Sequence, residues 1–188
     1  MGERLKKVLV VYSTVSGCTE TIAKRIGDDF IAYGACPRVV SVEDAPDFDD
    51  DLDAVVFGSG MRMGKFHKDA RAWLQENIDE LSRIPLALFS VGLRAVPSQS
   101  GGAGGVVQAE RDLDAAVSSL GGSLQPVGSV VLPGWKRSEG FNTMEKLALR
   151  VYPLEDGDYR DWDKVDAWVR EIAPVLLGNG PLWGSIEQ

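Results

Sequence analysis

The chain is 188 residues long, with 44% hydrophobic and 26% charged residues and a formal net charge of −8 at pH 7. This length and composition are typical of one folded domain and exclude a largely disordered chain. The excess of Asp and Glu argues against a nucleic-acid partner, because binding to phosphate backbones needs concentrated Lys and Arg. An acidic surface instead favours encounters with partners that carry basic patches.

The two cysteines, Cys18 and Cys36, form no CxxC motif and no cluster with histidine. We therefore expect neither a disulfide framework nor a metal site, and we expect a reducing, cytoplasmic location. The first residues lead directly into an apolar run, so the sequence predicts no signal peptide, and no run is long enough to cross a bilayer. The oligomeric state is left open.

In chain order, the first predicted strand is the β-branched run at residues 8–12, which is typical of a strand buried on both faces. A helix with one apolar face follows over residues 22–30 and ends near Gly34. Residues 39–42 are a weaker strand, expected at a sheet edge. The acidic residues 47–51 are expected to form a loop.

Residues 54–57 are the third predicted strand, and the apolar period from Phe66 to Leu81 predicts a helix. The fourth strand is predicted at residues 86–89. A Gly/Ser-rich loop at residues 98–102 then precedes a helix over residues 106–120.

The fifth strand is predicted at residues 127–132. An additional segment follows at residues 133–153, with Trp135 in a loop and then a helix. The last helix covers residues 162–176, and the tail at residues 178–188 is expected to be frayed.

This alternation of five strands, each followed by a crossover helix, predicts an α/β, doubly wound parallel sheet with helices on both faces. No repeat or linker divides the chain, so we expect a single domain over residues 1–188 with its core at about 5–177. In open sheets of this kind, ligands bind beyond the carboxyl ends of the strands, where the strand order reverses. The loops after strands one, three, four and five are therefore the candidate sites.

The first of these loops joins a buried strand to a helix and is rich in hydroxyl side chains. It consists of Ser13, Thr14, Val15, Ser16, Gly17, Cys18 and Thr19. The free N–H groups and the dipole at a helix start favour an anion, and the hydroxyls add donors. We interpret the loop as a phosphate cradle. The alternative is that Ser and Thr only cap the helix.

Other phosphate sites do not fit this loop. A Walker P-loop needs Gly-Lys-Ser/Thr, whereas Gly17 is followed by Cys18 and Thr19. A nucleophilic Cys18 would need an arginine in its loop to hold the phosphate, so we interpret Cys18 as a backbone donor, with a reactive thiol as the alternative. A phospho-receiver domain would need acidic side chains at the ends of strands one and three, where Ser13 and Ser59 stand instead.

The loop after strand three resembles a dinucleotide fingerprint only superficially, because its third glycine falls one place late. Its residues are Gly58, Ser59, Gly60, Met61, Arg62, Met63 and Gly64. We interpret it as a flexible loop against a flat ligand, with polarizable contact from Met61 and Met63. The alternative is that both methionines fill the core.

Two further loops complete the predicted edge. The loop after strand four has small residues that let the backbone approach a ring, and it comprises Ser90, Val91, Gly92, Leu93 and Arg94. After strand five, Trp135 precedes Lys136 and Arg137. Trp135 either stacks on or shields a flat ligand, or it anchors the additional segment; the sequence leaves both open.

These loops resemble those of the flavodoxin family, whose FMN-phosphate motif is rich in Ser and Thr around a Gly-x-Thr, as in Gly17 to Thr19 here. A closer resemblance is to the flavodoxin-like, menaquinone-dependent protoporphyrinogen dehydrogenases. It rests on residues 10–14, 58–67, 89–93 and 159–162.

The resemblance implies a five-stranded sheet in the order 2-1-3-4-5 and FMN as the cofactor. The FMN phosphate would lie at residues 13–19, and the ring would lie between the loops after strands three and four. Many flavodoxins hold the ring between aromatic residues of these loops, whereas Met61, Met63 and Leu93 stand here.

FMN itself would supply the redox chemistry, so no catalytic acid–base pair is expected. Arg62, Lys65 and His67 would meet an anionic substrate or a reduced flavin; the alternative for His67 is a surface residue at the start of a helix. The resemblance favours an oxidoreductase that uses a quinone or another small-molecule acceptor, and the acidic composition favours a non-catalytic electron carrier between protein partners. A third alternative is an interaction domain without flavin.

Overall fold

The computed structural model describes residues 4–48, 51–97, 102–121, 124–137 and 154–178. Its long strands are β1 (Lys6–Ser13), β2 (Ala35–Ser41), β3 (Ala54–Arg62), β5 (Leu86–Gly92) and β6 (Gly128–Pro133). They pair in the order β2-β1-β3-β5-β6, and every pair is parallel. The predicted α/β class and the predicted strand order 2-1-3-4-5 are therefore confirmed.

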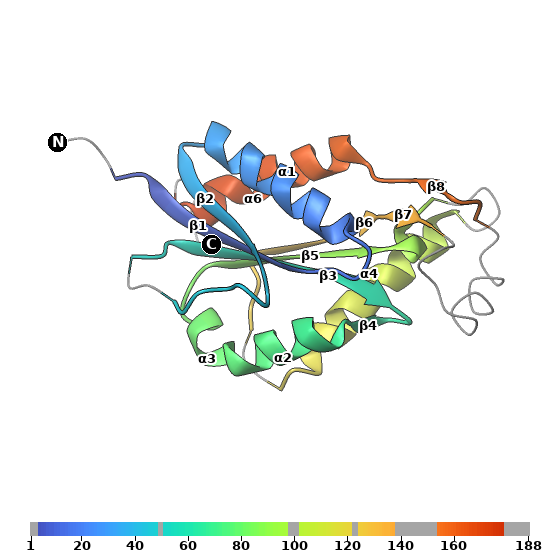
Figure 1. Ribbon diagram of the computed structural model, residues 1–188, viewed down its shortest axis with the longest axis horizontal. Helices are drawn as coiled ribbons and strands as arrows, with labels where there is room; N and C mark the ends of the chain where they lie inside the picture. The colour runs from blue at the N-terminus through green and yellow to red at the C-terminus, as the bar shows by residue number, and fades with distance from the viewer. Residues whose placement is uncertain (1–3, 49–50, 98–101, 122–123, 138–153, 179–188) are drawn as a thin grey trace, which may run out of the picture.

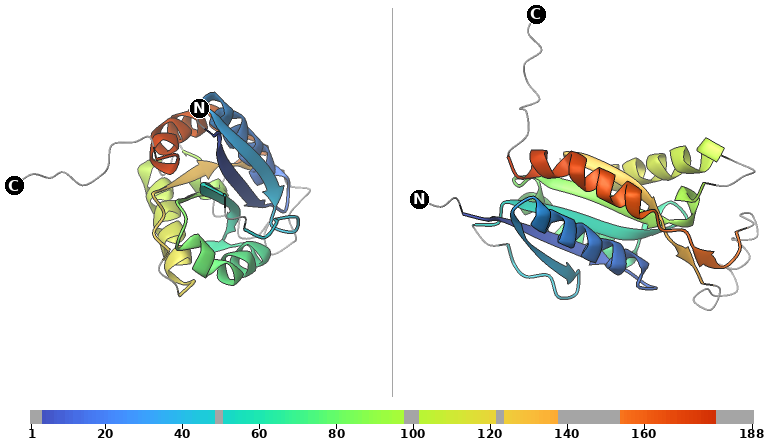
Figure 2. Two further views of the ribbon diagram at one scale, coloured as in Figure 1. Left: turned by 90° about the vertical axis from the view of Figure 1, so that its left-hand side faces the viewer. Right: turned by 90° about the horizontal axis from the view of Figure 1, so that it is seen from above.

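Helices cover both faces of this sheet (Figures 1 and 2). One face carries α1 (Cys18–Ala32) and α6 (Trp162–Leu176), and the other carries α2 (Lys68–Glu76), α3 (Ile78–Leu81) and α4 (Gly102–Ser118). Each face has its own apolar core, because successive side chains of a strand point to opposite sides. On β1, Val8 and Val10 pack in the core under α1 and α6, while Leu9 and Val11 pack in the other core.

The central strands are buried on both faces, as their continuous apolar runs predict. β2 lies at the sheet edge and is only partly buried, and it starts four residues earlier than expected, at Ala35. Gly34 has a φ of +74° and follows Tyr33, the C-cap residue of α1, so the helix ends near Gly34 as predicted. On β3, Gly58 has no room for a side chain, because a Cβ there would lie 1.9 Å from the Phe89 ring.

The connection from β2 to β3 does not contain the expected crossover helix. The described residues 42–48 and 51–53 form turns and extended chain, and Pro46 lies in the middle of the connection, where it would interrupt a helix. Apolar side chains of this connection pack against the core under α2 and α4. Phe48 stacks on Trp73 of α2 with ring centroids 6.0 Å apart, and Trp73 stacks on Phe57 of β3 at 5.4 Å.

The helix expected from Phe66 to Leu81 is two shorter helices. Phe66 belongs to the short strand β4 (Lys65–Phe66), which pairs with the end of β3, and α2 begins only at Lys68. Asn77 separates α2 from α3. Its side-chain Nδ2 donates to the Trp73 carbonyl at 2.8 Å and so competes with the helical backbone pattern.

The additional segment after β6 begins with a small antiparallel ribbon. Trp135 was expected in a loop, but it lies in β7 (Trp135–Lys136), which pairs with β8 (Gly157–Asp158). The helix expected in this segment falls within residues 138–153, outside the described residues. The expected frayed tail also lies outside them except for Gly178, so both stay predictions.

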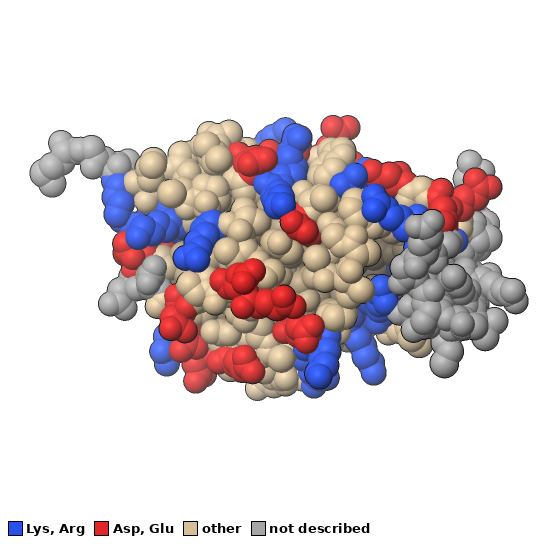
Figure 3. Space-filling view, in the orientation of Figure 1, with Lys and Arg blue, Asp and Glu red and all other residues tan. Residues whose placement is uncertain are grey.

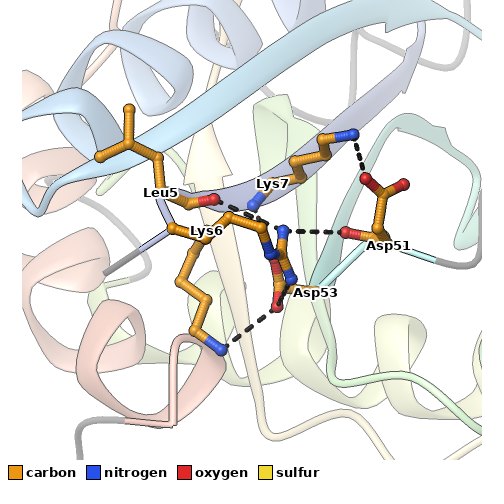
Figure 4. Close-up of polar contacts among 6 residues, drawn as sticks. Leu5, Lys6, Lys7, Asp51 and Asp53 are labelled. Atoms are coloured by element: carbon orange, nitrogen blue, oxygen red, sulfur yellow. Dashed lines mark hydrogen bonds and ion pairs between the residues drawn. The ribbon is translucent and has the colours of Figure 1, made fainter. Parts of the chain in front are cut away.

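At the amino end of the sheet, Asp53 ties the start of β1 to the start of β3 (Figure 4). Its carboxylate accepts the Lys7 backbone N–H at 2.8 Å, the Lys6 ammonium at 3.2 Å and two Arg4 guanidinium nitrogens at 3.0 Å. Burial alone would raise the pKa of Asp53, but these donors outweigh it and hold the pKa below its usual value. The ionised carboxylate therefore stabilises the fold above the unfolded pKa of about 4.

We predict that Asp53→Asn lowers the free energy of unfolding by about 1–3 kcal/mol at pH 7, the range for lost hydrogen bonds to a charged group. The difference should shrink as the pH falls through the lowered pKa of native Asp53, because the wild-type carboxylate is then protonated as well. Urea denaturation at pH 7 and at acid pH measures both effects. Asp51→Asn is the matched control, because Asp51 pairs with Lys7 but its side chain is 54% exposed; an equal loss in that variant would contradict the prediction.

Candidate functional site

The carboxyl ends of three neighbouring strands bring three serines into one row. Ser13 of β1 is in register with Ser59 of β3, and Ser59 is in register with Ser90 of β5. All three side chains are buried. They follow strand residues of the core under α2 and α4 by two positions, so the row lies on that side of the sheet. The predicted loops after these strands therefore meet at one edge.

The first loop leads into α1 through a glycine in the left-handed region. Gly17 has a φ of +82°, and its N–H donates to Thr14 Oγ1 at 3.0 Å. No side chain of the described residues caps the start of α1. At the start of α6, by contrast, Asp161 accepts the Lys164 N–H at 2.9 Å. The Ser and Thr residues of the first loop are therefore not used as caps of α1, and its first-turn N–H groups stay available to an anion.

Thr19 lies at the junction between this loop and β3. Its side chain is 2% exposed, and a Cβ at Gly60 would lie 3.6 Å from the Thr19 hydroxyl oxygen. Ser59 Oγ donates to the Gly60 carbonyl at 2.9 Å. The end of β3 at Gly60 therefore lies next to the helix start.

The segment after β3, interpreted from the sequence as a flexible loop, is a tight hairpin. β3 continues to Arg62, and Met63 and Gly64 form a two-residue turn with φ values of +50° and +74° before β4. Positive φ at both turn residues is typical of a type I′ hairpin. Met61 is partly buried against the core under α2 and α4, whereas Met63 is 82% exposed, so the core-filling alternative fails for Met63.

The end of β5 lies beside this hairpin, and at Gly92 its backbone carries no side chain. Val91 is buried, and a Cβ at Gly92 would lie 3.4 Å from the Met61 carbonyl oxygen. Leu93 begins a short 3₁₀ turn, η1 (Leu93–Ala95). The predicted site residues at the ends of β3 and β5 are thus neighbours. At position 92 only backbone faces Met61, because Gly92 has no side chain.

Trp135 contacts the first loop directly. Its indole Nε1 donates to Ser16 Oγ at 3.3 Å, and its ring lies 3.6 Å from the Cβ position of Gly17. Its backbone N–H donates to Cys18 Sγ at 3.3 Å. Trp135 therefore holds the additional segment against the loop, which agrees with the anchoring alternative and leaves its contact with a ligand untested.

The environment of Cys18 does not activate its thiol. Burial raises the pKa of Cys18, and the Trp135 N–H and Arg160 only partly oppose this effect. Because the thiolate is the reactive form, a raised pKa argues against a nucleophile. Cys18 is the first residue of α1, and its role as a backbone donor to a ligand stays a prediction.

Arg160 is a residue of this site that the sequence analysis did not single out. Its guanidinium donates to Thr21 Oγ1 at 2.9 Å and to both carboxylate oxygens of Asp158, and it lies 4.7 Å from the centroids of both Trp135 and Trp162. Thr21 is 139 positions away in the sequence. Two features of the sequence could have indicated Arg160. Residues 159–162 are one of the stretches that resemble the protoporphyrinogen dehydrogenases, and Trp135 is followed by cations.

Residues 9–162 match the profile of the flavodoxin domain family. The chain belongs to this family. FMN is the cofactor of the family, so the chain is an FMN-binding, flavodoxin-like redox domain. The predicted cofactor is therefore confirmed.

Solved structures show the same fold. A flavodoxin from the domain Archaea superposes with a TM-score of 0.53 at 17% identity, covering 90% of this chain and 98% of its own. Oxidised flavodoxin 2 from Bacillus cereus gives 0.52 at 16% identity, covering 90% and 99%. The rubredoxin oxygen:oxidoreductase of Desulfovibrio gigas gives 0.53 at 13% identity, covering 92% of this chain but 36% of that protein.

A curated relative is the protoporphyrinogen IX dehydrogenase [quinone] of Leishmania major, which is 32% identical over 100 residues. The matched region is 50% of this chain and 42% of the relative. The likeness therefore spans less than half the length of that protein.

The residues present fit FMN. The start of α1 offers uncapped N–H groups, Gly17 turns the chain into that helix with a φ of +82°, and the ends of β3 and β5 lie at the same edge of the sheet. We assign the phosphate to residues 13–19, and we assign the ring to the neighbourhood of Gly60, Met61, Gly92 and Leu93. This placement stays a prediction.

We predict that Thr19→Val weakens FMN binding by about 1–3 kcal/mol, because it removes a hydroxyl donor to a charged group. Thr19→Ser keeps the hydroxyl and should retain an affinity close to that of the wild type. Titration of the apoprotein with FMN, followed by flavin fluorescence, measures both. An unchanged dissociation constant in Thr19→Val would count against the assigned loop.

Proposed function

We propose that this domain belongs to an FMN-dependent oxidoreductase of the protoporphyrinogen dehydrogenase or quinone reductase type. The observation that carries the proposal is the 32% identity over 100 residues to a protein of that name. The match includes less than half of that relative. For this domain, the activity of that relative is therefore a hypothesis about the substrate class.

Cations on the β3–β4 hairpin support an anionic substrate. Arg62 and Lys65 lie opposite each other across the two strands, on the side away from Met61 and Phe66. Two cations on one face of the hairpin would attract the carboxylates of such a substrate.

The cationic surface extends from β4 onto α2. A groove of about 610 Å³ lies between β4, α2 and α4, and its lining includes Lys65, Lys68 and Arg71 together with Phe66 and alanines. The space-filling view shows Lys and Arg side chains gathered in this region, at the lower right (Figure 3). An apolar floor with cations at its margin suits a substrate that is both hydrophobic and carboxylated.

FMN, when bound, supplies the two-electron chemistry that no side chain can provide. The protein would hold the phosphate at the start of α1 and orient the ring edge by backbone groups near Gly60 and Gly92. Each pair of hydrogens removed from the substrate would reduce one quinone to its quinol. No side chain is required as a dedicated acid–base pair in this scheme.

We predict that the FMN-loaded protein oxidises protoporphyrinogen IX under anaerobic conditions when a soluble menaquinone analogue is present. The rise of porphyrin fluorescence measures the reaction. Lys65→Gln should raise KM about fivefold through loss of one charge contact near the surface, whereas Arg83→Gln should not. Arg83 is exposed and lies before β5, at the amino ends of the strands and therefore away from the hairpin. A rate no higher than that without protein would rule out this activity.

The second candidate is a non-catalytic electron carrier, favoured by the net charge of −8. An acidic surface would steer the domain toward basic redox partners. Potentiometric titration separates the two functions. Two well-separated one-electron steps without turnover of porphyrinogen would support the carrier, and a single two-electron step with turnover would support the enzyme.

A cytoplasmic location is part of this proposal, as is an electron acceptor that is either a quinone or a protein. No helix in the described ranges combines the length and the apolar character needed to traverse a bilayer.

A further inference from the structure

We propose that Arg137, held on Trp135 beside the first loop, makes this domain prefer a phosphorylated flavin over riboflavin, and that Arg160 positions Trp135 for this role. The proposal deepens the cofactor assignment and needs FMN binding, but it does not need the oxidoreductase activity. It assigns a role to the ribbon of β7 and β8, which the core fold does not require.

Trp135 is the link between this ribbon and the phosphate loop. Three contacts hold it there: the indole bond to Ser16, the backbone bond to Cys18 and the ring packing at Gly17. All three partners lie in the loop itself or at the first residue of α1. A charge that is fixed on the Trp135 ring is therefore fixed close to the anion site.

Arg137 is such a charge. Its guanidinium carbon lies 4.0 Å from the centroid of the Trp135 ring, a favourable cation–π distance. The first loop contains no Lys or Arg, and Glu20 in the first turn of α1 already pairs with Lys24 at 2.6 Å. A cation held on Trp135 would therefore add a charge that the loop itself does not supply.

Arg160 has a different part, because its charge is already balanced. It is 16% exposed and forms a two-point ion pair with Asp158 on β8. Its guanidinium also bonds Thr21 of α1 and lies between the rings of Trp135 and Trp162 in contact distance of each. Arg160 thus connects α1, β8 and Trp135, and its effect on the ligand passes through the position of Trp135.

The surroundings of the Cys18 thiol agree with a cation near the helix start. Burial raises the pKa of Cys18; the Trp135 N–H, Arg160 and Arg137 act in the opposite direction, and Asp158 opposes Arg160. Cys18 is the first residue of α1. A phosphate bound at the same helix start would therefore be stabilised mainly by Arg137, because the charge of Arg160 is paired with Asp158.

The test compares FMN with riboflavin on the apoprotein, by calorimetry or flavin fluorescence. We expect Arg137→Gln to weaken FMN binding about fivefold, the effect of one partly screened charge, and to leave riboflavin binding within about twofold. The FMN difference should shrink in high salt. Arg170→Gln removes the same charge from an exposed position on α6 and should change neither ligand.

Arg160→Gln should reduce the preference for FMN and also alter Trp135 fluorescence, whereas Arg160→Lys should restore the preference only in part, because it lacks the planar two-point pair with Asp158. Thermal unfolding verifies that each variant is folded. Equal losses for FMN and riboflavin in Arg137→Gln, or an unchanged FMN affinity, would overturn the proposal. Failure of the wild-type protein to bind either flavin would instead overturn the cofactor assignment, and loss of turnover alone would bear only on the proposed enzyme.

Discussion

Parallel pairing of β1, β3 and β5 is the constraint on which the site depends. Because parallel strands all end at the same edge, loops from distant parts of the sequence must meet there. The register is fixed by the apolar side chains on both faces, since a slip by one residue would exchange the two cores. The row of Ser13, Ser59 and Ser90 is a consequence of that register. Burial in the middle of the sheet thus sets the geometry at its edge.

The starts of α1 and α6 lie at the same edge of the sheet, where Arg160 bonds Thr21, but their N–H groups are used differently. α6 begins with Asp161, which satisfies one of its own N–H groups. α1 begins with Gly17 in the left-handed region and has no side-chain cap among the described residues. A cap contributes about 0.5–2 kcal/mol to a helix. Without a side-chain cap, α1 is locally less stable. An anion bound to the N–H groups of its first turn would offset this loss.

The sequence was sufficient where the information is local. The β-branched runs predicted the central strands, and the hydroxyl-rich residues 13–19 lie together in the chain and in the fold. Two elements failed because side chains compete with simple periodicity: Pro46 prevents a helix between β2 and β3, and the Met63–Gly64 turn converts the start of a predicted helix into β4. Arg160 could not be found, because its bond to Thr21 depends on the packing of α6 and β8 against α1.

The same distinction between local and global properties applies to charge. A net charge of −8 describes the field at long range, which governs encounters with other proteins. A bound anion responds mainly to charges within the Debye length, about 8 Å at physiological ionic strength. Within the described chain, Arg137 and Arg160 lie against Trp135, which itself contacts the phosphate loop. An acidic protein can therefore hold a dianionic cofactor firmly, and its overall charge does not decide between an enzyme with an anionic substrate and a carrier with a basic partner. In the proposed enzyme, the local charge of Arg62 and Lys65 on the hairpin would instead attract the substrate.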